Sequence, residues 1–88
     1  MKKKPWPEIR KKMHEKFDLQ IGKNGITQQI VTVAKQLLKQ KKIIKVKFLK
    51  NIAETKEDAK KLAEELSEKT GAKIGKVIGK TAVLYKEE

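Results

Sequence analysis

The fold of this 88-residue chain is decided by one stretch, Leu19-Gln20-Ile21-Gly22-Lys23-Asn24-Gly25-Ile26-Thr27. Its apolar start predicts a short strand, and the periodic apolar residues that follow predict a helix with Thr27 as its N-cap. The Gly-x-x-Gly turn between them allows unusual backbone angles and close approach of another chain. The free N–H groups of the helix start, together with Lys23, favour an anion in this turn. By itself the motif is more typical of a plain strand-to-helix turn.

Length and composition exclude several classes of protein. Eighty-eight residues make one small domain without room for a deep substrate cavity. The absence of cysteine and the single histidine, His14, exclude disulfides, thiolate metal sites and multi-histidine metal sites. No apolar run approaches the ~18 residues of a membrane span. The basic start is followed by Pro5-Trp6-Pro7-Glu8 instead of the apolar core of a signal peptide. We therefore expect a soluble, cytoplasmic protein that does not interact with a membrane.

Positive charge is concentrated in the first part of the chain. Residues 1–50 contain fifteen Lys or Arg and three acidic residues, which accounts for the whole net charge of +12. Residues 51–88 contain eight Lys and eight acidic residues. A lysine- and glutamate-rich surface of a heat-adapted protein would account for the second part but not for the first. The distribution favours a polyanionic partner.

The pattern of apolar residues predicts an α/β fold, a single compact domain with the order α-β-α-β-α-β-β and one mixed sheet with packed helices. Residues 1–6 are expected to form a basic flexible arm and residues 7–88 the domain. The first helix should begin near Pro7 and carry a core stripe of Ile9, Met13 and Phe17, with Trp6 as a cap on the core. The other expected elements are a strand at 19–21, a helix at 27–40, a strand at 43–50, a helix at 55–70 opened by a Thr55/Asp58 capping box and closed by Gly71, and strands at 72–78 and 81–85.

Three groups of surface residues are candidates for polyanion binding besides the glycine turn. Gln28, Thr32 and Lys35 share one stripe of the helix that follows the turn, and they suit either a phosphate backbone or ordinary solvent contacts. Lys45 and Lys47 point away from the apolar face formed by Ile44, Val46 and Phe48, either for solubility or for binding. Arg10 lies on the first helix outside its apolar stripe.

Nothing in the sequence predicts an enzyme, a cofactor or a metal site. Gly79-Lys80-Thr81 resembles the end of a phosphate-binding loop, but Ile74 stands where the pattern needs glycine, and strand-like residues follow where it needs a helix. No acid, base and nucleophile converge in sequence. We expect neither catalysis nor a small-molecule substrate.

Several motifs in the same order resemble the CRM domain, the YhbY-like RNA-binding family. They cover roughly residues 8–86 and comprise Gln20 to Thr27, Ile43 to Lys47, Thr70-Gly71-Ala72 and Val77 to Tyr85. The resemblance implies a fold like the C-terminal domain of a bacterial translation initiation factor and a Gly-x-x-Gly loop similar to that of KH domains, which holds nucleic-acid backbone. Stand-alone members associate with precursors of the large ribosomal subunit. The resemblance thus implies RNA binding in ribosome assembly, with Gly22, Lys23, Asn24 and Gly25 as the RNA-contacting loop.

The predicted RNA-binding surface therefore comprises Gly22, Lys23, Asn24, Gly25, Gln28, Thr32, Lys35, Arg10, Lys45 and Lys47. The expected partner is RNA, either ribosomal RNA or the precursor large subunit, and the protein is expected to be a monomer. One alternative is a chromatin protein of the Alba type, which coats duplex DNA. Another is an adaptor for membrane surfaces or acidic proteins, although a domain of this size needs its apolar stripes for its own core.

Overall fold

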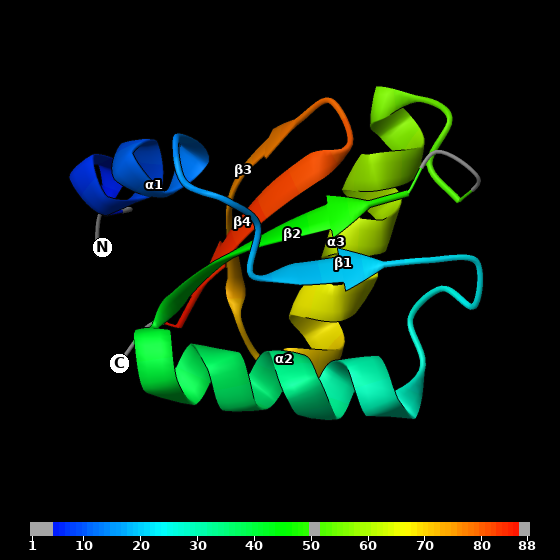
Figure 1. The fold of residues 1–88 in the computed structure, drawn as a ribbon, viewed down its shortest axis with the longest axis horizontal. Helices are drawn as coiled ribbons and strands as arrows, with labels where there is room; N and C mark the ends of the chain where they lie inside the picture. The colour runs from blue at the N-terminus through cyan, green and yellow to red at the C-terminus, as the bar shows by residue number, and fades with distance from the viewer. Residues whose placement is uncertain (1–4, 50–51, 87–88) are drawn as a thin grey trace.

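The chain follows the predicted order of elements in the computed structural model, which describes residues 5–49 and 52–86 (Figure 1). The elements are α1 (Trp6–Met13), β1 (Leu19–Ile21), α2 (Gln28–Lys41), β2 (Ile43–Phe48), α3 (Lys56–Thr70), β3 (Lys73–Ile78) and β4 (Thr81–Tyr85). The predicted α/β fold with a single mixed sheet is confirmed. Helix α1 begins at Trp6, the last residue of the segment assigned to the basic arm, and residues 1–4 of that arm lie outside the described residues.

The sheet has the strand order β1-β2-β4-β3. Strand β1 pairs with β2 in parallel, whereas β4 pairs antiparallel with both β2 and β3. A parallel pair needs a crossover connection, and here α2 provides it. The glycine turn is therefore the first connection, from β1 to α2, of a β–α–β crossover. Figure 1 shows it at the end of β1, before the chain enters α2.

One face of the sheet, the inner face, packs against α2 and α3. Ile44, Val46 and Phe48 are fully buried there, as the alternation in the sequence predicts. Helix α3 contributes Ala59, Ala63 and Leu66 to the same core. Helix α2 contributes Val31, Ala34 and Leu38, while Ile30, Val33 and Leu37 pack only partly buried against the core.

The residues that were predicted to cap the helices do form the caps. The Thr27 hydroxyl accepts a hydrogen bond from the backbone N–H of Ile30 at 3.2 Å, as an N-cap does. Thr55 and Asp58 form the reciprocal capping box, and Gly71 ends α3 with a φ of 77°. These local signals define where α2 and α3 begin, and hence where the glycine turn ends.

The other face of the sheet, the outer face, is partly covered by α1 (Figure 1). Ile9 is fully buried against Val83 and Tyr85. It also packs over Gly75 at an irregularity in β3, where an added Cβ would lie 2.9 Å from the Cδ1 atom of Ile9. A side chain at position 75 would therefore force Ile9 to shift, because α1 lies directly on the strand.

The prediction that the apolar stripe of the first helix continues from Met13 to Phe17 is wrong. The helix ends there, and Phe17 lies outside it with 42% of its surface exposed. The Lys45 ammonium donates to the Met13 carbonyl at 2.7 Å and to the Glu15 carbonyl at 2.9 Å, which holds the chain after α1 in a turn. Trp6 is 43% exposed, so the prediction that it caps the core is also wrong. Ile9 fills that part of the core, with Met13 packed partly buried against the same cluster.

A buried carboxylate, Asp18, connects α1, α2 and β2. Its Oδ2 atom lies 2.7 Å from Lys12 Nζ and accepts from the backbone N–H of Lys45 at 2.9 Å. Its Oδ1 atom accepts from Lys41 Nζ at 2.8 Å. The side chains of Asp18 and Lys12 are only 7% and 9% exposed. Burial disfavours the charged form of each group, but their mutual hydrogen bond and attraction outweigh burial, so the pKa of Asp18 is lowered and that of Lys12 is raised.

We predict that Asp18→Asn lowers the free energy of unfolding by about 3 kcal/mol, because the buried Lys12 ammonium loses its partner at 2.7 Å and keeps only the exposed Glu15 carboxylate at 3.4 Å. Urea unfolding followed by circular dichroism measures the change. Glu65→Gln is the control, since it removes the exposed ion pair with Lys69 and should change stability by less than about 1 kcal/mol. Equal effects of the two substitutions would contradict a structural role for Asp18.

The lowered pKa of Asp18 also predicts a pH dependence. Ionised Asp18 stabilises the fold above the pKa of about 3.9 that an aspartate has in an unfolded chain. This contribution is lost as the pH falls through the lower pKa of the folded state. The difference in unfolding free energy between the parent and Asp18→Asn should therefore be constant near neutral pH and shrink below about pH 4. A difference that does not change down to strongly acidic pH would contradict this assignment.

Candidate functional site

The two glycines of the turn between β1 and α2 differ in what a side chain would meet there. Gly25 has a φ of 69°, a conformation that side chains with a Cβ rarely adopt, and its N–H donates to the Gly22 carbonyl at 2.9 Å. Gly22 has no such angle. Instead, a Cβ at this position would lie 3.3 Å from the Leu49 Cδ1 atom, closer than side chains normally pack. The turn is thus tightly closed, with Lys23 and Asn24 exposed at its tip.

The turn forms one wall of an open hollow of about 630 Å³, a size within the range of small-ligand sites. The opposite wall is the first turn of α2, with Thr27, Gln28 and Gln29, and Leu49 forms the side of the hollow. Among residues 5–49 and 52–86, the side chains around it include one cation, Lys23, and no carboxylate. The hollow therefore presents amide groups, backbone and a positive charge, a set that suits an anion.

The start of α2 differs electrostatically from that of the other two helices. The first turns of α1 and α3 contain Glu8 and the pair Glu57 and Asp58, which offset the positive end of each helix dipole. The first turn of α2 contains no acidic residue. No acceptor for the N–H groups of Gln28 and Gln29 lies among the described residues. The positive end of the α2 dipole, which no acidic residue of its first turn offsets, faces the hollow directly.

The predicted stripe on α2 extends away from this hollow. Gln28 lines the hollow, but Thr32 and Lys35 lie farther along the exposed side of the helix. The Thr32 hydroxyl donates to the Gln28 carbonyl at 3.0 Å, so it is engaged within the helix. Lys35 lies beside Lys39, close to the point where α3 ends. The structure therefore brings only the first residue of the stripe to the turn.

The other three predicted cations belong to the outer face of the sheet. Lys45 uses its ammonium to hold the end of α1, as described above. Lys47 is exposed, and its Nζ lies 5.5 Å from the centre of the Phe17 ring, a cation–π distance. Arg10 is exposed on α1 near Trp6. None of the three lines the hollow at the turn.

Four residues of the hollow were not predicted as site residues, namely Thr27, Gln29, Ile30 and Leu49. Gln29 could have been recognised, because it stands in the first turn of the predicted helix. Leu49 could not, since only the parallel pairing of β1 with β2 brings it to the turn, where its N–H donates to the Ile21 carbonyl at 3.0 Å. A local sequence pattern contains no signal for such a contact.

No group of three or more His, Cys, Asp or Glu side chains that could hold a metal ion occurs within residues 5–49 and 52–86. Across the same described ranges, every helix is too short or too polar to cross a membrane.

Residues 2–86 match the model of the CRS1/YhbY (CRM) domain. None of the curated proteins matches the chain. Among solved structures, the chain is similar to the solution structure of SAV1595, a hypothetical protein from Staphylococcus aureus that is proposed to bind RNA. The two share 34% sequence identity with a TM-score of 0.76 over 91% of this chain and 80% of the other. The family model covers nearly the whole chain, and the chain therefore belongs to the CRS1/YhbY (CRM) domain family.

Proposed function

We propose that this protein binds RNA and that the loop Gly22–Gly25, together with the start of α2, holds the RNA backbone. The observation that carries the proposal is the hollow at the start of α2, where Lys23 lies beside a helix start without acidic residues and no carboxylate of the described part of the chain lines the hollow. A phosphate group is an anion of the right size to accept hydrogen bonds from the helix N–H groups. Membership of the CRM family and the similarity to a protein proposed to bind RNA support RNA as the partner.

The loop supplies the geometry and the rest of the basic region supplies the attraction. Because Gly22 and Gly25 have no side chains, a phosphate backbone can approach the main chain of the turn. Lys23 and Asn24 line the hollow beside this main chain. Long-range attraction by the cations of residues 1–50 would raise the rate of encounter with any polyanion. Short-range fit at the loop would then retain the backbone.

The natural target in this proposal is ribosomal RNA, as part of a precursor of the large subunit, and the cellular role is ribosome assembly in the cytoplasm. This part of the proposal is supported by the resemblance to stand-alone CRM proteins. We propose further that a monomer is the active form, since the loop and the hollow belong to one chain. Gln28 is the α2 residue that we expect to contact RNA beside the loop.

We predict that RNA affinity falls steeply with salt. Each phosphate contact releases counterions, so a plot of log affinity against log salt should have a slope of about −0.7 to −0.9 per contact. Several contacts are expected from the charge of residues 1–50, and the slope can be measured by fluorescence anisotropy with a ribosomal RNA fragment. A mixed-sequence DNA duplex at the same salt concentrations tests the alternative of a DNA-coating protein. A slope near zero would contradict the polyanion partner altogether.

We predict that Lys23→Asp combined with Asn24→Asp abolishes most RNA binding without unfolding the protein. The two carboxylates would repel phosphate at the point where the helix N–H groups should receive it. Both side chains are exposed, and negative charge near the start of α2 suits its dipole, so the melting temperature should change little.

The matched control for this variant changes the same number of charges elsewhere. Lys60→Gln with Lys61→Asp also lowers the net charge by three, but on the exposed side of α3. This control should weaken RNA binding much less than the loop variant. If the two variants bind RNA equally, the effect is one of net charge, and the loop is only a turn.

A further inference from the structure

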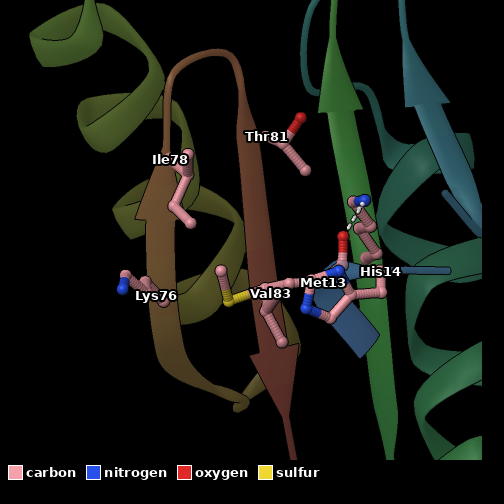
Figure 2. A pocket seen from close by; sticks show the side chains of 7 residues that line it. Met13, His14, Lys76, Ile78, Thr81 and Val83 are labelled. Carbon is pink, nitrogen blue, oxygen red and sulfur yellow. Dashed lines mark hydrogen bonds between the residues drawn. The ribbon is translucent and has the colours of Figure 1, made fainter. Parts of the chain in front are cut away.

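The outer face of the sheet carries a groove that the glycine loop does not include. It consists of three adjoining hollows. The first lies between Trp6, Arg10, Met13 and Lys76. The second shares Met13 and Lys76 with it and extends over Ile78 and Val83 to Thr81 and Lys45, as Figure 2 shows in part. The third shares Lys45 and Thr81 and continues to Phe17 and Lys47. Shared lining residues make the three hollows one continuous path from α1 across β3, β4 and β2.

The groove collects the exposed large hydrophobic side chains of the described part of the chain. These are Trp6, Phe17 and Ile78, with 43%, 42% and 45% of their surfaces exposed. Trp6 lies in the first hollow, Ile78 in the second and Phe17 in the third. Exposed hydrophobic side chains that gather on one face, instead of being scattered, mark a binding surface.

Cations lie between these apolar side chains. Arg10 and Lys76 accompany Trp6, while Lys16 and Lys47 accompany Phe17. Glu15 is the acidic residue among the lining side chains of the three hollows. A flat aromatic ring beside a cation offers the two contacts that a nucleotide needs, one for its base and one for its phosphate. A protein partner without negative charge would not match this surface.

The groove is adjacent to the loop through strand β1. Gln20 is exposed, and it stands beside Lys47 in the register of the parallel pair. Lys47 in turn stands beside Thr81, which pairs with Ile78. These four residues form one row across the outer face. Gly22 follows Gln20 by two residues, so the row leads directly to the glycine turn. One nucleic-acid strand could therefore contact both surfaces.

We infer that the groove binds unpaired bases of RNA, with Phe17 and Trp6 as stacking platforms and Lys47 and Arg10 as phosphate contacts. This inference rests on the proposed RNA binding and specifies its substrate as single-stranded segments. Bases in a duplex are stacked on one another and cannot lie on protein rings, whereas unpaired bases can. In this inference the loop binds the RNA backbone regardless of the base, whereas the groove distinguishes single strands from duplexes.

The chain contains a direct reporter for this inference, because Trp6 is its only tryptophan. A base that stacks on Trp6 should quench the intrinsic fluorescence of the protein. The probes are a single-stranded RNA of twelve mixed nucleotides and an RNA duplex of the same length, both titrated at one salt concentration. We expect strong quenching by the single strand and little by the duplex.

Substitutions at Phe17 separate stacking from charge. Phe17→Leu should weaken binding of the single strand roughly tenfold, since one base loses its aromatic platform, and should leave binding of the duplex unchanged. Phe17→Tyr keeps the ring and should restore binding. Lys47→Gln should weaken binding more than the control Lys61→Gln, which removes the same charge from the exposed side of α3. Circular dichroism and the melting temperature establish that each variant is folded.

Each outcome decides between the two proposals. If the parent binds the single strand while Phe17→Leu binds equally well and Trp6 fluorescence stays unchanged, the groove does not bind RNA, and the loop proposal survives. The groove would then suit a protein partner. If Phe17→Leu and Phe17→Tyr lose affinity for the single strand equally, the inference that a base stacks on Phe17 is wrong. The same conclusion follows if Phe17→Leu weakens binding of the duplex as much as binding of the single strand. If the parent binds neither RNA, the proposed function and the inference both fail.

Discussion

The Asp18 carboxylate joins segments that hydrophobic packing alone does not bring together. Helix α1 has only eight residues, too few to be stable in isolation, and Ile9 is its one fully buried apolar side chain. The ion pair between Asp18 and Lys12 attaches the helix to the start of β1. The contacts of Asp18 with Lys41 and with the backbone of Lys45 attach that same point to α2 and β2. A buried carboxylate must be matched by its cations in a defined geometry. The contacts of Asp18 therefore orient the elements that carry the glycine turn and those that carry the groove.

The two faces of the sheet differ in how completely they are covered. Helices α2 and α3 cover the inner face, whereas α1 covers only part of the outer face. The central strand β4 is therefore buried on both sides, with Ala82 and Leu84 inside and Val83 and Tyr85 outside. The uncovered remainder of the outer face is the groove. A helix of ordinary length in place of α1 would cover that area and leave only the loop available to a partner.

Charge and topology together make one end of the molecule suitable for RNA. Helix α3 carries five of the eleven acidic residues, and the positive end of its dipole is offset by its own carboxylates. The start of α2 lacks such residues and lies beside Lys23. The parallel crossover places this helix end next to β1, whose Gln20 borders the row of the outer face that leads into the groove. The phosphate-binding and base-binding surfaces that we propose are thus neighbours, the first where β1 ends and the second on the outer face that Gln20 borders.

The sequence by itself determined the order of the elements, the glycine turn, the capping box of α3 and the inner face of β2, because each depends on residues near one another in the chain. It also placed Lys23 and Gln28 at the candidate site. Only the tertiary structure decided that α1 stops at Met13, that Phe17 and Trp6 are exposed, and that Lys45 is engaged. These outcomes depend on contacts across the sheet, such as that of Lys45 with the end of α1 and that of Ile9 with Gly75. Periodicity reports which side chains share a face, but not which neighbour will cover that face.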